Sequence, residues 1–147
     1  MSAQPRSPGA APVGRLADLP PLERKVIRCL RLWSAGPDGQ AALGRELGAH
    51  YGPQAAARLQ ADLTDLLATT VRHARRPLLG HAIDCPCAGS DECVFARFVA
   101  LAAEGAREEA VLIATLLVRA DLALGLSALA EDIGLGMMRG SEVRFLQ

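Results

Sequence analysis

The sequence predicts an all-α domain of five to six helices, a bundle-like arrangement in which a cysteine-containing loop joins two three-helix halves. Half of the 147 residues are hydrophobic but only 3% are aromatic, so Leu, Ala, Val and Ile must fill the core. Apolar residues recur at a helical period in successive segments, and Gly or Pro separates those segments. The length suits one domain with a shared core.

The division of the chain follows from local composition. Residues 1–18 are rich in Pro, Gly and Ala, and we expect a disordered N-terminal tail because such a segment buries little apolar surface. Residues 19–147 form the single helical domain, with halves at 19–76 and 90–134. Residues 77–89 link the halves and are called the Cys loop below. Residues 135–147 carry only a faint apolar alternation and receive no assignment.

Three helices are expected in the first half. The first runs from Pro20 to about Ala35, and its apolar stripe consists of Leu22, Val26, Cys29, Leu30 and Trp33. Cys29 is therefore expected in the core, where it acts as a small hydrophobe. The cationic side chains fall mostly on the opposite side of this helix: Arg24, Lys25, Arg28 and Arg31. Turns with glycine and proline separate a second helix, at about 40–50, from a third at about 53–74.

A basic corner ends the third helix, just before Pro77. It consists of Arg72, His73, Arg75 and Arg76. Cations in a last turn offset the negative end of the helix dipole, which explains such a cluster without any ligand. The alternative is a corner that binds an anion or docks a partner.

The second half is expected to hold three further helices. The fourth begins at Ser90 as N-cap, with Asp91 and Glu92 in its first turn, and continues to about residue 104. The fifth, at about 106–119, contains the apolar run 110–118 and is expected to be the central helix; the alternative is that this run forms a homodimer contact. The sixth begins at Asp121 and ends near Gly134.

The charge balance bears on partners. The formal net charge is zero, which argues against a general nucleic-acid or membrane-surface binder. Residues 1–80 nevertheless carry 11 Arg and Lys against 6 Asp and Glu, whereas residues 81–147 carry 5 against 10. The basic half leaves open a DNA-associated transcriptional regulator, although neither Gly48 nor Gly52 gives a register that fits a helix-turn-helix.

The chemistry of the sequence is concentrated between residues 81 and 93. The spacing H-x3-C-x-C-x5-C places four side chains that zinc prefers within thirteen residues: His81, Cys85, Cys87 and Cys93. A closed zinc site would fasten the Cys loop to the start of the fourth helix. The C-P-C pair is tighter than the usual C-x2-C of zinc knuckles. An iron–sulfur cluster is less favoured, because it needs four ligands and Cys29 or His81 would have to join the three loop cysteines.

The same cysteines also allow thiol redox chemistry. Cys93 lies at a helix N-terminus, which lowers a thiol pKa, and Cys85 or Cys87 would then form a disulfide with it. A thiol-dependent enzyme with Cys93 paired to His81 or His73 is a further alternative, and so is a loop without chemistry. The sequence lacks the phosphate-binding, serine hydrolase and metalloprotease motifs.

Two resemblances rest on these residues. The segment from His81 to Cys85 resembles the start of the H-x3-C-x2-C motif of zinc-binding anti-sigma factors, with Cys87 one residue too early for the second cysteine. This resemblance implies an anti-sigma-like factor with a sigma-factor partner. The chain as a whole resembles small Arg/Ala-rich helical proteins of alphaproteobacteria that have no assigned function.

Localisation and function complete the prediction. The first residues contain no apolar run typical of a signal peptide, and no apolar run reaches the length of a membrane span, so we expect a cytoplasmic protein. Thiols are reduced there, which favours metal or redox chemistry over structural disulfides. The sequence predicts a small regulatory or protein-interaction domain, with a protein partner and without enzymatic activity, whose Cys loop holds zinc or responds to oxidants.

Overall fold

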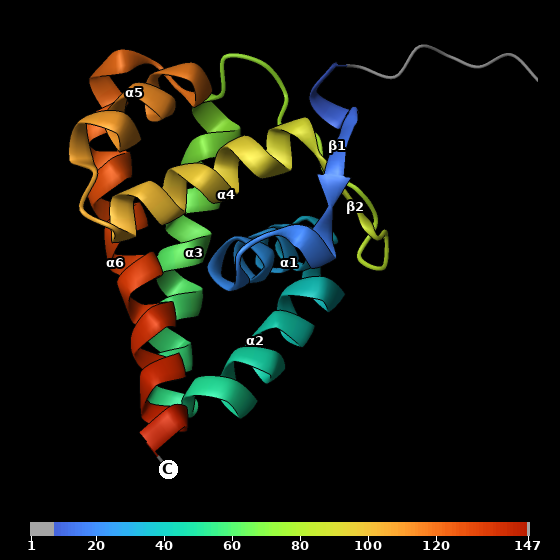
Figure 1. Ribbon diagram of the computed structural model, residues 1–147, viewed down its shortest axis with the longest axis vertical. Coiled ribbons are helices and arrows are strands. Elements are labelled where there is room, and N and C mark those ends of the chain that lie inside the picture. Colours follow the sequence, from blue (N-terminus) through green and yellow to red (C-terminus); the bar gives the residue numbers. More distant parts are fainter. Residues whose placement is uncertain (1–7, 147) are drawn as a thin grey trace, which may run out of the picture.

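The computed structural model describes residues 8–146, with the side chains of residues 8–139, and confirms the all-α class (Figure 1). Six helices make up most of the chain: α1 (Pro21–Ser34), α2 (Pro37–Tyr51), α3 (Pro53–His73), α4 (Ser90–Ala103), α5 (Arg107–Leu117) and α6 (Ala120–Leu146). Two short strands, β1 (Pro12–Arg15) and β2 (Cys87–Gly89), pair antiparallel. Short 3-10 helices at Pro8–Ala10 and Leu16–Asp18 flank β1.

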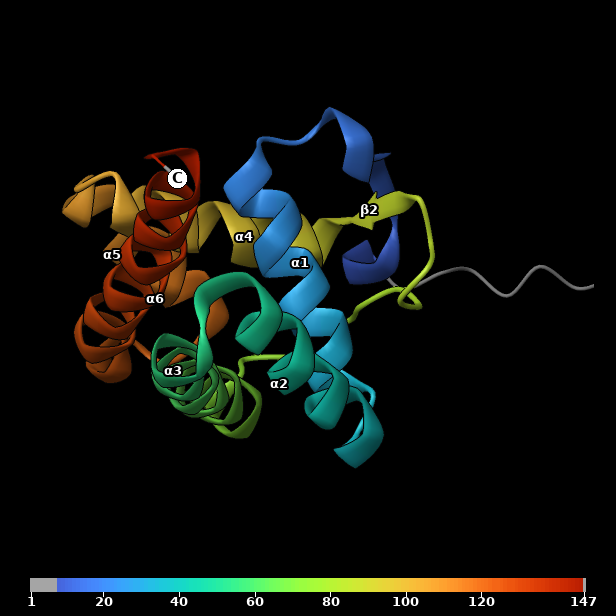
Figure 2. The ribbon, with the colours of Figure 1, turned by 90° about the horizontal axis from the view of Figure 1, so that it is seen from below.

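Helix α4 is the centre of the fold. It packs against α1, α5 and α6, whereas α3 runs beside α6 and α2 packs on α1 and α3 (Figure 1). Viewed from below, α1 lies between α4 and α2 (Figure 2). The buried apolar residues form one cluster that includes members of all six helices. The two sequence halves therefore share a single core.

The expectation that the fifth helix is central was wrong. On α4, Phe95, Phe98 and Val99 are fully buried, whereas α5 buries only Ala110, Ala114 and Leu117. Two of the three leucines of α5 point outward instead: Leu112 is 66% exposed and Leu116 is 68% exposed. A helix that is apolar on all sides can be buried at the centre of a fold. Whether it is buried depends on how the other helices pack around it.

Helix α6 continues past the end expected near Gly134 and reaches Leu146. A Cβ atom on Gly134 would lie 2.6 Å from the Cβ of Ala103, and one on Gly136 would lie 3.0 Å from a methyl of Leu59. These glycines let α6 approach α4 and α3 closely. They are packing positions rather than helix terminators.

Residues 8–18 are structured, so the disordered tail expected at 1–18 was wrong for this part; residues 1–7 lie outside the described residues. Strand β1 pairs with β2, which lies inside the Cys loop, where no secondary structure was expected. A pairing of three residue pairs is too short to give a periodic signal, and each strand depends on a partner more than seventy positions away. Residues 8–15 are called the N-terminal arm below.

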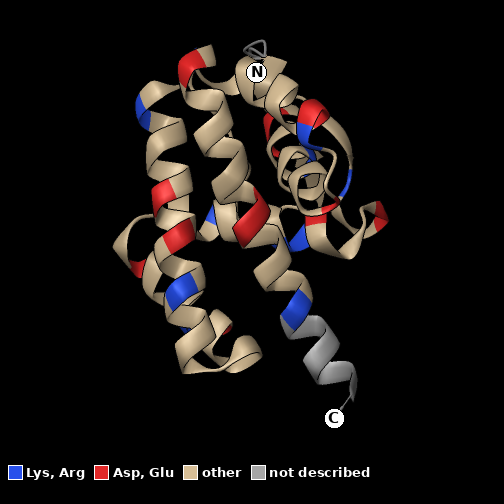
Figure 3. Ribbon diagram, turned by 90° about the vertical axis from the view of Figure 1, so that its left-hand side faces the viewer, with Lys and Arg blue, Asp and Glu red and all other residues tan. Residues whose placement is uncertain are grey.

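Two surface properties follow from this arrangement. Among the residues that the structure describes, no helix is both long enough and apolar enough to span a membrane. On the side where α3, α5 and α6 lie, acidic and basic residues are interspersed (Figure 3). That side presents no field of a single sign.

Candidate functional site

A buried ion pair lies under the Cys loop and joins α1 to α4. The side chains of Arg31 and Glu92 are only 1% and 0% exposed. Arg31 Nε donates to Glu92 Oε2 at 2.7 Å, and Nη2 donates to Oε1 at 2.9 Å. Two parallel bonds of this kind are the strongest form of an arginine–carboxylate pair.

The remaining donors of Arg31 fasten the loop. Its Nη1 donates to the carbonyl oxygens of Ile83 and Cys85, at 3.4 and 2.7 Å, and its Nη2 donates to that of Cys87 at 2.7 Å. Together with the two bonds to Glu92, these contacts use all five N–H donors of the guanidinium. One buried side chain thus sets the path of the backbone through the C-P-C segment.

Glu92 fastens the same loop from the other side. Its carboxylate accepts from the main-chain N–H of His81 at 3.1 Å and of Gly89 at 3.0 Å. Burial alone would raise the pKa of Glu92, but the bonds from Arg31, Gly89 and His81 outweigh burial and lower that pKa. The N-cap of α4 is Gly89 rather than the expected Ser90.

A second carboxylate holds the start of the loop. Asp91 is 3% exposed and accepts two bonds from Arg76, the shorter at 2.6 Å, and one from the N–H of Leu79 at 2.8 Å. Gly9 of the N-terminal arm lies directly against this pair, since a Cβ at Gly9 would come within 2.1 Å of Asp91 Oδ2. The arm therefore reaches the first turn of α4.

These supports present one thiol beside one imidazole. His81 Nδ1 lies 3.3 Å from Cys85 Sγ, and His81 Nε2 lies 2.7 Å from the carbonyl oxygen of Ala10. A carbonyl oxygen only accepts, so Nε2 carries a hydrogen and donates it to Ala10. Nδ1 is then the atom that exchanges a proton with Cys85. The thiol, the imidazole and the group that orients the imidazole have the arrangement of an activated cysteine.

The electrostatics favour Cys85 as the reactive thiol. The N–H of Cys87 and the His81 ring lower the pKa of Cys85, and the hydrogen bond with Cys85 raises the pKa of His81. Cys93 was expected to have the lowered pKa, and that expectation was wrong. Burial and the charge of Glu92 raise the pKa of Cys93. The dipole of α4 favours a thiolate there, but a carboxylate at the preceding residue opposes it.

The predicted metal ligands are only partly assembled. The structure brings His81 and Cys85 together, but in the part of the chain that it describes no three His, Cys, Asp or Glu side chains are placed to hold one metal ion. Cys87 belongs to β2, and Cys93 packs against the core. Zinc and an iron–sulfur cluster stay predictions from the sequence. Cys29 is 6% exposed, which confirms its place in the core.

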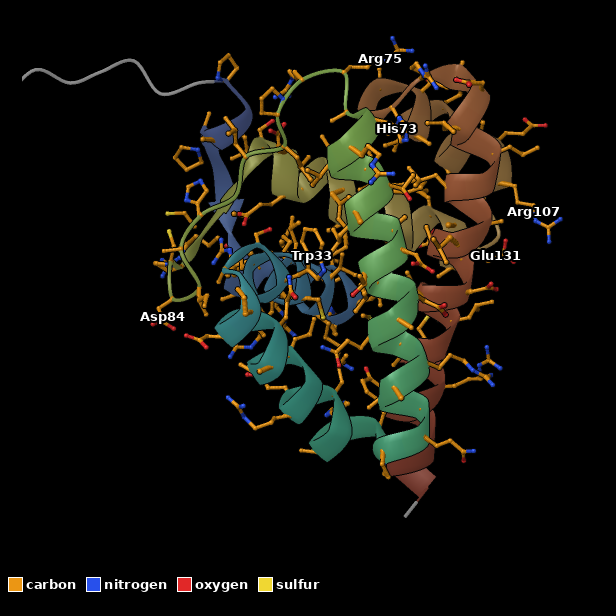
Figure 4. All side chains as sticks on the ribbon, turned by 180° about the vertical axis from the view of Figure 1, so that it is seen from behind. Trp33, His73, Arg75, Asp84, Arg107 and Glu131 are labelled. Atoms are coloured by element: carbon orange, nitrogen blue, oxygen red, sulfur yellow. The ribbon has the colours of Figure 1, made fainter. Side chains whose placement is uncertain are left out.

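The basic corner has mainly structural contacts. Arg75 Nε donates to the carbonyl oxygens of Thr115 and Val118 at the end of α5, and Arg76 binds Asp91. Arg72 is exposed and His73 is half-buried. Figure 4 shows His73 and Arg75 at one end of α3, far from the loop tip at Asp84. His73 and Arg75 are therefore apart from the loop tip, whereas Arg76 contacts the start of the Cys loop through Asp91.

Sequence reasoning missed the residues that build the site. Arg31 was expected on the cationic side of the first helix, opposite the apolar stripe, and Glu92 only in the first turn of the fourth helix, although both are buried. The one signal was position: Arg31 lies one helical turn after Ile27, an apolar residue outside the predicted stripe. No protein-family model, no curated protein and no solved structure matches the chain.

Proposed function

We propose that this protein is a small cytoplasmic regulatory domain, acting on a protein partner, whose Cys loop responds to oxidants through Cys85. The contact of Cys85 Sγ with His81 Nδ1 carries this proposal. The flanking Asp84 and Pro86 are exposed, so a small oxidant reaches the loop from solvent. The buried pair of Arg31 and Glu92 keeps the backbone of the loop in place beneath the thiol.

The oxidant class that fits is a hydroperoxide. The Cys85 thiolate attacks one peroxide oxygen, the S–O bond forms and the O–O bond breaks. The departing oxygen takes the Nδ1 proton of the His81 imidazolium and leaves as an alcohol or water. The sulfur is oxidised by two electrons to a sulfenic acid, and the peroxide is reduced.

Cys87 is the expected resolving thiol. It lies two residues from Cys85, and its main-chain N–H already faces the Cys85 sulfur. Attack of the Cys87 sulfur on the sulfenic acid forms the S–S bond and releases water. The product is a disulfide within the C-P-C segment, which a cellular thiol reductant would return to the reduced state.

Thiol labelling under native conditions tests the proposal. With a limiting amount of iodoacetamide at neutral pH, Cys85 should react about tenfold faster than Cys93, because its thiolate fraction is larger. Cys29, whose pKa burial raises to about 12, should react last. Peptide mass spectrometry reports each rate. Faster labelling of Cys93 than of Cys85 would overturn the proposal.

Two matched variants sharpen the test. His81→Gln removes the partner of the thiolate and should slow the labelling of Cys85, whereas Cys93→Ser should leave that rate unchanged. With hydrogen peroxide, Cys87→Ser should accumulate a sulfenic acid at Cys85 that dimedone traps.

Elemental analysis tests the zinc alternative. One zinc per chain, together with protection of Cys85, Cys87 and Cys93 from labelling, would replace the redox proposal with a zinc clip.

A further inference from the structure

We propose that covalent modification of Cys85 releases the N-terminal arm, residues 8–15, from the Cys loop and the start of α4. This inference rests on the proposed function, because it takes Cys85 to be the thiol that reacts. It adds what the reaction changes: the docking of a segment more than seventy positions away in the sequence.

The arm is held by the Cys loop, which carries Cys85, and by the start of α4. Strand β1 pairs with β2 through Pro12 and Gly89, Gly14 and Ala88, and Arg15 and Cys87. The N–H of Ser90 donates to the carbonyl oxygen of Ala11, and the N–H of Leu16 donates to that of Pro86, each at 2.9 Å. A movement of residues 81–90 would therefore disturb each of these strand pairings and hydrogen bonds.

The side chains of the arm add little to this hold. All four residues of β1 are exposed, and Val13 is 60% exposed. Anchoring to the core begins only after the strand, where Leu16 and Leu19 pack against the buried cluster. Since few apolar contacts hold the arm, its docking depends on a small number of hydrogen bonds, and losing one changes the docked fraction measurably.

One imidazole connects the thiol to the arm. The two nitrogens of His81 contact Cys85 Sγ, at 3.3 Å, and the Ala10 carbonyl oxygen, at 2.7 Å. The ring also packs on Gly89, where a Cβ would come within 2.8 Å of His81 Cδ2. A sulfur that has gained an oxygen or an alkyl group occupies the space next to Nδ1. Because Gly89 blocks one side of the ring, the ring must turn, and its bond to Ala10 breaks.

Tryptic cleavage after Arg15 measures the docking. Arg15 is the last residue of β1, so the protease reaches this bond when the arm detaches. The test uses the Cys87→Ser/Cys93→Ser chain, in which iodoacetamide forms an S–C bond at Cys85 and releases iodide. Alkylation at Cys85 should accelerate cleavage about fivefold, the effect of one lost hydrogen bond on the detached fraction.

Two glycine variants calibrate the measurement. Gly9→Ala should accelerate cleavage in the reduced protein, because the new Cβ would lie 2.1 Å from Asp91 Oδ2. Gly14→Ala is the matched control, since its Cβ would have no neighbour within 4 Å, and it should cleave at the parent rate. Circular dichroism checks that both variants keep their helices.

Substitutions at His81 separate the two bonds of the ring. Asn places an amide near the position of Nδ1 and Gln places one near Nε2. His81→Asn should therefore cleave fast before alkylation and gain little from it, whereas His81→Gln should cleave slowly in the reduced form. Equal cleavage of the alkylated and reduced parent chains, with Gly9→Ala still fast, would overturn the inference. If Cys93 labels faster than Cys85 in the unsubstituted chain, the proposed function fails instead.

Discussion

Arg28 and Arg31 lie one turn apart on α1, and each makes two bonds to a glutamate. The pair of Arg28 with Glu46 is about half exposed, at 49% and 45%, whereas the pair of Arg31 with Glu92 is buried, at 1% and 0%. The exposed pair links α1 to α2, and water competes for both partners. The buried pair links α1 to α4 and also binds the backbone of the Cys loop.

The difference shows that bond geometry alone does not determine how much an ion pair contributes to the free energy of unfolding. Exposed pairs contribute little to the free energy of unfolding, because solvent screens the charges. A buried pair contributes little relative to an apolar replacement, but the loss of one partner leaves a charge without compensation. Around Arg31, five loop contacts depend on the same two side chains: three carbonyl oxygens and two N–H groups.

The largest expected effect on the free energy of unfolding comes from Glu92. Glu92→Gln should lower the free energy of unfolding by about 3–5 kcal/mol, because Arg31 stays buried without a counter-charge. Glu46→Gln, the matched exposed change, should cost less than about 1 kcal/mol. Urea unfolding of both variants measures the difference. Equal losses would show that burial does not distinguish the pairs.

A double variant sharpens the same comparison. Arg31→Met/Glu92→Leu removes both charges, a replacement that often leaves stability unchanged in buried pairs. Here we expect no recovery, because the loop carbonyls and N–H groups lose their partners as well. If urea unfolding gives this double variant the same free energy of unfolding as the unsubstituted protein, the pair does not support the loop.

Acid should break the buried pair in a defined direction. The pKa of Glu92 is lowered in the folded protein, so the unfolded chain binds the proton more tightly. The stabilisation is complete above the ordinary value of 4.5 and is lost as the pH falls below it. The free energy of unfolding measured against pH should therefore decline on the acid side. Glu92→Gln should flatten that decline more than Glu46→Gln does.

The smallest effect is expected at the exposed leucines of α5. Leu112→Ser and Leu116→Ser should each change the free energy of unfolding by no more than about 0.5 kcal/mol, since both side chains already face solvent. The homodimer through residues 110–118 stays a prediction with the same variants as its test. If two copies pair there, the melting temperature of the unsubstituted protein rises with protein concentration. The Leu112→Ser/Leu116→Ser variant should then remove that dependence.

The sequence by itself determined the helices and part of the core. Helix α3 was expected at about 53–74 and occupies Pro53–His73, and Cys29 lies in the core as its place on the apolar stripe predicted. Helical periodicity is a local property that each segment carries independently of its neighbours. For the same reason Pro53 was a reliable mark of where α3 begins.

Only the tertiary structure decided the site. Arg31 became buried because the Cys loop and Glu92 cover it, and α4 rather than α5 became central because of the helices that pack around it. The choice of Cys85 over Cys93 depends on His81 beside one sulfur and Glu92 near the other. These outcomes depend on groups that the fold brings together, and a pattern along one segment does not contain the environment that other segments supply.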